Sequence, residues 1–244
     1  MAKDRNQSRP PAARAEQTPA SRRAEIDSFV ERARALGPRI DGKRGRLIFA
    51  LDATMSRQPT WDLACELQAA MFEETAAVGG LDVELVYYRG LAECRATRWV
   101  SDPTRLKGLM EKIDCRGGHT QIGRVLEHVR KEAKRAKVDA FVFVGDAMEE
   151  KVDDLCAKAG ELALLGVPAF LFQEGGDAIA ERAFREIARL TGGAWCPFDA
   201  GAASQLRELL RAAAAFAAGG RRALADLSTR TGGAGAVKLL GQMR

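Results

Sequence analysis

Three oxygen-bearing side chains follow the first long apolar segment of the chain. The run Leu47–Leu51 is entirely apolar, and Asp52, Thr54 and Ser56 come directly after it at every second position. An unbroken apolar run of this length is typical of a strand that is buried on both faces of a parallel sheet. Ligand sites in open α/β sheets lie at the carboxyl ends of such strands. Carboxylate and hydroxyl oxygens suit Mg²⁺ or Mn²⁺, so the spacing predicts a metal site here.

Two later segments supply further oxygen atoms. Gly117 and Gly118 form a glycine-rich turn before Thr120, which stands at the start of a helix expected over residues 121–137. Residues 140–145 form a second apolar run, which ends at Asp146 much as the first run ends at Asp52. The hydroxyl of Thr120 and the carboxylate of Asp146 therefore complete the candidate metal site.

These three segments together resemble von Willebrand factor A domains. The shared pattern is Asp-x-Thr-x-Ser after the first strand, a Gly-Gly-x-Thr loop, and a single Asp after a later strand, within about residues 44–215. The order of the segments favours a metal site over the alternative that the two aspartates and Thr54 only cap helices. Two departures are that Thr54 stands where the family usually has Ser, and that Asp146 lacks the usual flanking residues.

The resemblance implies a metal-ion-dependent adhesion site. In that family the corresponding oxygens hold a divalent cation, and a carboxylate from a partner protein completes its coordination. The metal ligands carried over to this chain are Asp52, Thr54, Ser56, Thr120 and Asp146. The expected ion is Mg²⁺ or Mn²⁺.

Alternating apolar and amphipathic segments predict the elements that position this site. Strands are expected over residues 47–51, 81–88, 92–100, 140–145, 167–172 and 194–198, with helices between them. This alternation predicts an α/β fold with a doubly wound, mostly parallel six-stranded sheet flanked by helices. The resemblance implies a Rossmann-like arrangement with strand order 3-2-1-4-5-6. Asp102 is expected to cap a helix, and Glu149, Glu150, Asp153 and Asp154 are expected in the first turns of another.

Composition divides the chain into four segments. Residues 1–22 are predicted to be a disordered basic tail, and residues 23–43 an N-terminal helix and linker. Residues 44–218 form the predicted domain, and residues 219–244 a C-terminal tail with short helices. The net charge is +5, and residues 1–46 alone hold 12 Lys/Arg and 6 Asp/Glu. Because the rest is near neutral and residues 1–28 contain no aromatic side chain, nucleic-acid binding is not favoured.

Other sequence features point to a soluble cytoplasmic protein. No apolar run approaches the ~18 residues of a membrane span, and the first residues lack the apolar core of a signal peptide. The five cysteines are scattered singly and are odd in number, which suits a reducing compartment rather than a disulfide framework. Neither a membrane partner nor a zinc cluster is expected.

These observations favour a binding module over an enzyme, because no nucleophile–base pair is visible. We expect an adaptor or scaffold of a bacterial intracellular type. An Asp or Glu of a partner protein would complete the coordination of its metal ion. By analogy at the level of the fold, that partner is an ATPase or a chaperone-like factor. Two alternatives remain open. One is a metal-dependent phosphoester hydrolase that uses the same oxygens, and the other is a nucleic-acid-associated scaffold that acts through the basic N-terminal tail.

Overall fold

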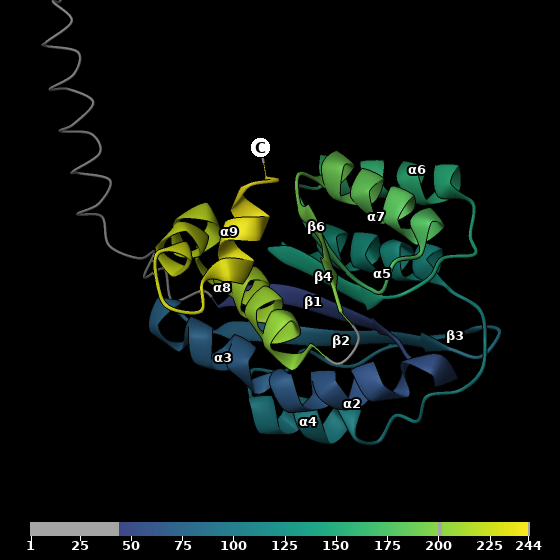
Figure 1. The fold of residues 1–244 in the computed structure, drawn as a ribbon, viewed down its shortest axis with the longest axis horizontal. Coiled ribbons are helices and arrows are strands. Elements are labelled where there is room, and N and C mark those ends of the chain that lie inside the picture. Colours follow the sequence, from purple (N-terminus) through teal and green to yellow (C-terminus); the bar gives the residue numbers. More distant parts are fainter. Residues whose placement is uncertain (1–43, 200–201, 244) are drawn as a thin grey trace, which may run out of the picture. The chain divides into compact units, whose positions relative to one another are not determined.

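A six-stranded sheet of order β3-β2-β1-β4-β5-β6 runs through the part of the chain that the computed structural model describes, residues 44–199 and 202–243 (Figure 1). Its strands are β1 (Gly45–Asp52), β2 (Leu81–Arg89), β3 (Glu93–Ala96), β4 (Ala140–Gly145), β5 (Ala169–Glu174) and β6 (Ala194–Phe198). All neighbours pair in parallel except β2 and β3, which are antiparallel. The predicted fold class and strand order are therefore confirmed.

The central strand shows how the sheet separates two hydrophobic cores. Leu47, Phe49 and Leu51 of β1 point into one core, whereas Ile48 and Ala50 point into the other. Side chains alternate between the faces of a strand, so a strand covered by helices on both sides must be apolar throughout. This explains the unbroken apolar runs of β1 and β4 in the sequence.

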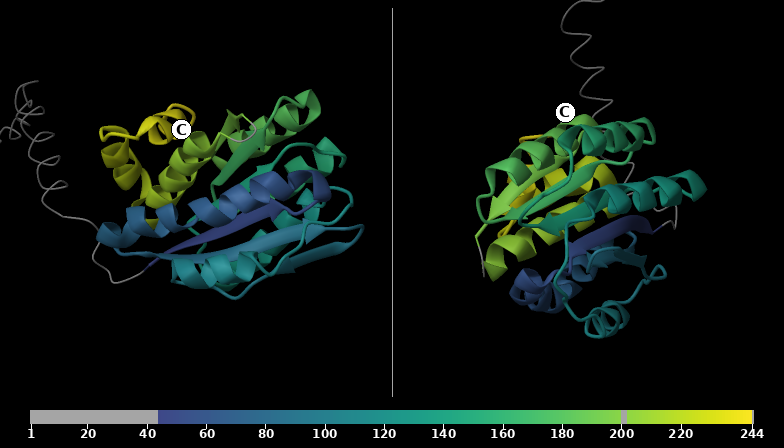
Figure 2. Two further views of the ribbon diagram at one scale, coloured as in Figure 1. Left: turned by 60° about the horizontal axis from the view of Figure 1, so that its bottom comes forward. Right: turned by 90° about the vertical axis from the view of Figure 1, so that its right-hand side faces the viewer.

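Helices cover both faces of the sheet (Figures 1 and 2). The core that contains Leu47 is completed by α2 (Gln58–Leu67), α3 (Ala69–Thr75), α4 (Pro103–Met110) and α8 (Ala203–Ser228). The opposite core is completed by α5 (Ile122–Arg135), α6 (Val152–Leu164) and α7 (Ala178–Thr191). Short 3-10 turns, η1 (Met55–Arg57) and η2 (Ala76–Val78), lie before α2 and after α3. Because β1, β4 and β5 are parallel neighbours in the sheet, their carboxyl ends lie side by side.

The third strand is shorter than predicted. Residues 93–96 form β3 at the edge of the sheet, and Val100 makes an isolated bridge to Val83. The predicted cap at Asp102 is present, because its carboxylate accepts a hydrogen bond from the Arg105 backbone N–H at 2.8 Å. The mixed polarity of residues 92–100 thus indicates an edge strand and the loop that follows it.

The C-terminal segment belongs to the same fold. The expected boundary at residue 218 falls inside α8, which continues to Ser228 across a kink at Gly220, where φ is 65°. Leu224 and Leu227, together with Leu239 of α9 (Ala234–Leu240), are buried in the core that contains Leu47. The expected short helices are therefore packed against the domain rather than extended from it.

The predicted segments 1–22 and 23–43 lie outside the described residues. Within the described residues, no helix is long and apolar enough to cross a membrane.

Candidate functional site

Asp52 is the innermost carboxylate of the candidate site. It is the last residue of β1 and is only 4% exposed. One of its oxygens, Oδ1, accepts a hydrogen bond from the Thr54 backbone N–H at 2.8 Å, and the Thr54 hydroxyl lies 3.5 Å from that of Ser56. Burial raises the pKa of Asp52, hydrogen bonds from Thr54 oppose that rise, and the negative charge of Asp146 adds to it. The structure therefore brings together the first three predicted ligands and couples Asp52 to Asp146.

An arginine occupies the other side of this cluster. The guanidinium of Arg57 lies 3.3 Å from Oδ2 of Asp146 and forms an ion pair with Glu174, at the end of β5. The hydroxyl of Thr60 also donates to Glu174. Arg57 and Glu174 are almost fully buried, whereas the Asp146 side chain is 32% exposed. Two carboxylates thus share one buried cation, and together with Asp52 the cluster retains an excess of negative charge that a divalent ion would neutralise.

Thr120 is positioned by the loop after β4. Its hydroxyl accepts a hydrogen bond from the Glu149 backbone N–H at 3.1 Å, and its own N–H donates to the Glu149 carboxylate at 3.3 Å. The structure therefore ties Thr120 to the segment that carries Asp146, and the hydroxyl keeps a second lone pair for another partner. No hydrogen bond joins Thr120 directly to Asp52 or Asp146 among the described residues.

The prediction of acids in the first turn of α6 is confirmed for Asp153 and Asp154, but it is wrong for Glu149 and Glu150, because α6 begins only at Val152. Glu150 instead accepts hydrogen bonds from the backbone N–H groups of Ile122 and Gly123, at the start of α5. These groups have no partner within the helix, and the helix dipole favours a negative charge at this end. The two glutamates thus fasten the Thr120 loop and α5 to the end of β4.

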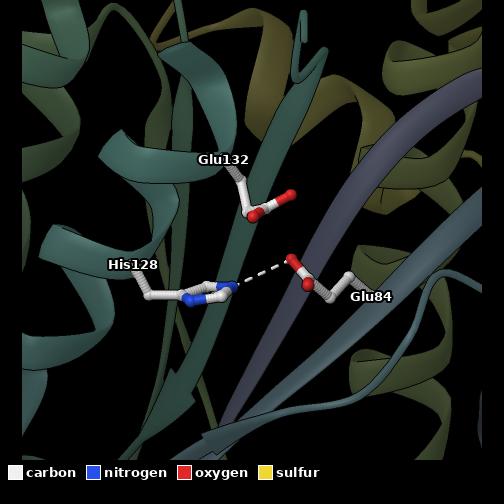
Figure 3. Close-up of side chains that lie close together, drawn as sticks. All are labelled: Glu84, His128 and Glu132. Carbon is white, nitrogen blue, oxygen red and sulfur yellow. Dashed lines mark hydrogen bonds and ion pairs between the residues drawn. The ribbon is translucent and has the colours of Figure 1, made fainter. Parts of the chain in front are cut away.

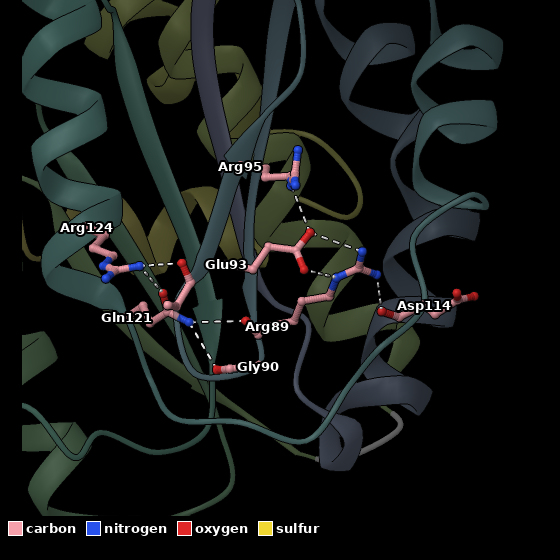
Figure 4. Close-up of polar contacts among 8 residues, drawn as sticks. Arg89, Gly90, Glu93, Arg95, Asp114, Gln121 and Arg124 are labelled. Carbon is pink, nitrogen blue, oxygen red and sulfur yellow. Dashed lines mark hydrogen bonds and ion pairs between the residues drawn. The ribbon is translucent and has the colours of Figure 1, made fainter.

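Polar contacts of Gln121 hold the same loop on its other side (Figure 4). The side-chain N–H of Gln121 donates to the backbone carbonyl groups of Arg89 and Gly90, both at 3.2 Å, and Arg124 donates to the side-chain oxygen Oε1 of Gln121 at 3.0 Å. A Cβ atom on Gly118 would lie 2.1 Å from the carbonyl oxygen of Gly90. Only glycine fits at position 118 without moving one of the two backbones.

We therefore expect Gly118→Ala to destabilise the domain and to displace Thr120. The clash is with backbone atoms, so overpacking should cost about 2 kcal/mol in the free energy of unfolding. Gly117→Ala is the matched control, because a Cβ there meets nothing within 4 Å. Chemical denaturation of both variants measures the difference. Equal stability of the two variants would contradict this account of the loop.

The donor set fits a hard divalent cation. Two carboxylates and three hydroxyls are oxygen ligands of the type that Mg²⁺ and Mn²⁺ prefer. The hydroxyl of Tyr88 is buried beside Asp52, and burial, followed by the negative charge of Asp52 and a hydrogen bond to it, raises the pKa of Tyr88 far above its ordinary value. This buried hydroxyl makes the surroundings of the acidic cluster polar, which suits a bound ion.

The cysteine nearest to Asp52 in the electrostatics of the site is not suited to bind a metal ion through its sulfur. The five cysteines are free, and Cys115 interacts electrostatically with the Asp52 carboxylate. Burial, followed by the negative charges of Asp52 and Asp62, raises the pKa of the Cys115 thiol to about 11. The thiol therefore stays protonated at neutral pH, and a protonated thiol is a poor metal ligand.

Sequence reasoning missed three groups that shape the site, namely Arg57, Tyr88 and Glu174. Arg57 directly follows the Asp-x-Thr-x-Ser segment, and its burial next to a strand end is not visible from its type. Tyr88 is opposite Asp52 in the register of β1 and β2, so the parallel pairing could have indicated it. Glu174 ends β5 as Asp52 ends β1, and this shared position is the signal that could have found it.

Comparison with known proteins identifies the fold. No protein-family model and no curated protein sequence matches the chain. Among solved structures, an aerotolerance-related membrane protein from Bacteroides fragilis aligns with a TM-score of 0.54 and 18% identity, over 70% of this chain and 98% of that one. The SpRpn10 VWA domain aligns with a TM-score of 0.53 and 10% identity, over 66% of this chain and 90% of that one.

A third similar structure has a metal in its site. Proximal thread matrix protein 1 from the mussel byssus, with a zinc-occupied metal-ion-dependent adhesion motif, aligns with a TM-score of 0.51 and 19% identity. The alignment covers 70% of this chain and 45% of that protein. At these identities the comparisons show the fold, which is that of a von Willebrand factor A domain.

Proposed function

We propose that this chain is a metal-dependent protein-binding module that works as an adaptor or scaffold. The ligands of its divalent cation are Asp52, Thr54, Ser56, Thr120 and Asp146, with Mg²⁺ or Mn²⁺ as the ion. A carboxylate from the partner protein completes the coordination. This assignment extends to the chain what the zinc-occupied motif of the mussel protein indicates for a similar fold.

The observation that carries the proposal is the excess negative charge at the ends of β1 and β4. Asp52 and Asp146 interact electrostatically, and the buried Arg57 is already shared between Asp146 and Glu174. A divalent cation between the two aspartates would offset the cost of burying Asp52. Hydroxyl ligands add no charge, so the bound ion stays electrophilic enough to attract a carboxylate from another protein.

The direct test of this proposal measures metal and partner together. The full chain is immobilised and exposed to cell lysate in Mg²⁺, in Mn²⁺ and with a chelator, and the retained proteins are identified by mass spectrometry. A partner that is retained with either metal and lost on chelation is then challenged with variants in which each surface Asp or Glu of its binding region is replaced. If the partner protein is retained equally with the chelator and after replacement of those carboxylates, the mechanism is contradicted.

Thr120→Ala should weaken metal binding by about tenfold, a loss of about 1.4 kcal/mol, because one neutral oxygen ligand is removed. It should also lower stability by about 1 kcal/mol, because the Glu149 backbone N–H loses its acceptor. Thr120→Ser is the matched control, because it keeps the hydroxyl and loses only a methyl group. Calorimetric titration with Mg²⁺ compares the three proteins. If Thr120→Ala and Thr120→Ser bind Mg²⁺ equally, Thr120 is not a ligand.

A further inference from the structure

A second group of metal-ligating side chains lies away from the site just described. Glu84 on β2 faces α5, where His128 and Glu132 stand four residues apart on one side of the helix (Figure 3). One ligand atom from each residue lies within 4.8 Å of the others, and His128 Nε2 is 3.0 Å from Glu84 Oε2. We propose that Glu84, His128 and Glu132 bind a zinc-class transition-metal ion that joins α5 to β2.

The position of Glu84 separates this site from the Asp52 cluster. Glu84 pairs with Ile48 in the parallel register, whereas Asp52 pairs with Tyr88 four residues further along. Four residues of a strand span about 13 Å. Two ions at such a distance share no ligand, so the second site stands or falls independently of the proposed function.

The carboxylates of Glu84 and Glu132 are both buried, and a nearby cation would offset the cost of burying their charge. The side chain of Glu84 is 6% exposed and that of Glu132 is 9% exposed. A buried carboxylate is costly unless a positive group or hydrogen bonds compensate for it. The ion-pair partner of Glu84 is His128, whose imidazole is charged only when it is protonated. A neutral imidazole leaves the charge of Glu84 without a permanent counter-ion.

Glu132 is in a different electrostatic position. It accepts hydrogen bonds from Trp99 Nε1 at 3.4 Å and from Arg135 at 2.5 Å, and the guanidinium of Arg46 is 3.9 Å away. Arg135 is 76% exposed, so its pairing is easily exchanged for water. Arg46 also stacks on the ring of Trp99. These groups hold the Glu132 carboxylate toward His128 and leave a free lone pair for a metal ion.

The ligand types select the class of metal. One imidazole nitrogen with two carboxylate oxygens suits Zn²⁺, and the related ions Co²⁺, Mn²⁺ and Ni²⁺, better than the all-oxygen preference of Mg²⁺. Three protein ligands leave a coordination position for water. His128 also lines a cavity of about 780 Å³ between β3, α5 and the start of α6, which gives an ion and water a route to the imidazole.

A zinc titration of the full chain tests the proposal. The background is Asp52→Asn, which removes a ligand of the first proposed site, and the probe is Zn²⁺ alone, followed by calorimetry and thermal unfolding. We expect the Asp52→Asn protein to bind one Zn²⁺ and to melt at a higher temperature with it. Adding His128→Gln should weaken zinc binding by at least about 100-fold, which is the upper range for loss of a mere supporting contact.

A second variant separates a metal site from a simple His–Glu ion pair. Glu132→Gln leaves the His128–Glu84 pair intact and removes the charge of the third ligand, so it should also weaken zinc binding by at least about tenfold, a 1.4 kcal/mol loss. Glu127→Gln is the matched control, because Glu127 lies on the same helix and lines the same cavity without belonging to the cluster. Cys94→Ser, in that cavity wall, controls for thiol binding, and the Co²⁺ absorption spectrum should show no thiolate charge-transfer band.

Three results would overturn the proposal. The first is that the Asp52→Asn protein binds no zinc. The second is that His128→Gln and Glu132→Gln bind zinc as tightly as the background protein. The third is that Cys94→Ser abolishes binding. None of these results bears on Mg²⁺ binding at Asp52, which is measured separately.

Discussion

Asp52→Asn is expected to abolish Mg²⁺ binding and, in the metal-free protein, to raise the melting temperature. The variant keeps the oxygen that accepts the Thr54 N–H, but it removes the charge that the metal needs. Burial raises the folded-state pKa of Asp52 above the ordinary value of 3.8. The folded state therefore holds this proton more tightly than the unfolded chain, and the ionised carboxylate at neutral pH opposes folding.

The sign of the pH dependence follows from that shift. Stability contributed by protonated Asp52 is fully present below pH 3.8 and is lost as the pH rises through the raised folded-state value. The gain from Asp52→Asn should therefore be largest at neutral pH and should shrink as the pH falls toward 3.8. We expect Asp52→Asn to raise the free energy of unfolding by about 1 kcal/mol, which is about 3 °C in melting temperature. A gain of this size is typical when a residue that serves function at the expense of stability is replaced.

Calorimetry with Mg²⁺ and thermal unfolding in chelator at several pH values measure both effects. Asp62→Asn is the control, because Asp62 is exposed on α2 and should change stability by no more than about 0.5 kcal/mol. Unchanged Mg²⁺ affinity in Asp52→Asn would remove Asp52 from the ligand set. A lower melting temperature in chelator would show that the ionised carboxylate is stabilising.

Arg57→Met is expected to have the largest effect on stability. Its loss leaves Glu174 buried with the Thr60 hydroxyl as its remaining donor, and it leaves Asp146 without a counter-ion. Removing one partner of a buried ion pair costs about 3 to 5 kcal/mol, because the other charge stays buried and uncompensated. In a domain of this size, that corresponds to a melting temperature lowered by about 10 °C.

The same variant should bind Mg²⁺ more tightly. Arg57 is a positive charge 3.3 Å from Asp146, so it competes with a divalent ion for that carboxylate. Removing it makes the site more negative, and metal affinity should rise by about tenfold, which is 1.4 kcal/mol. Opposite changes in stability and metal affinity distinguish a competing cation from a residue that merely supports the fold.

A double-mutant cycle isolates the ion pair. Glu174→Gln added to Arg57→Met removes the uncompensated charge, so the double variant should recover about 2 kcal/mol relative to additivity. Arg189→Met serves as the control, since the Arg189–Glu186 pair is more than one third exposed on both sides and is screened by solvent. Additive effects of the two buried substitutions, or Mg²⁺ affinity that falls in Arg57→Met, would contradict this interpretation.

The sequence by itself determined the elements and their burial. Strands buried on both faces must be apolar at every position, so β1 and β4 were readable as continuous apolar runs. A residue that ends such a strand lies where the strand leaves the sheet. Asp52 and Asp146 were therefore expected at the carboxyl ends of their strands. Strand order came from the resemblance to von Willebrand factor A domains, because local patterns do not specify which strands become neighbours.

The tertiary structure decided which charges meet. Arg57 and Glu174 are 117 residues apart, and Glu84 and His128 are 44 residues apart. Glu149 and Glu150 looked like the first turn of α6, yet they bind Thr120 and the start of α5. Sequence spacing indicates only neighbours within one element, whereas these contacts depend on strand register and on how each helix packs across the sheet. The electrostatic balance of both proposed metal sites therefore depends on the folded chain.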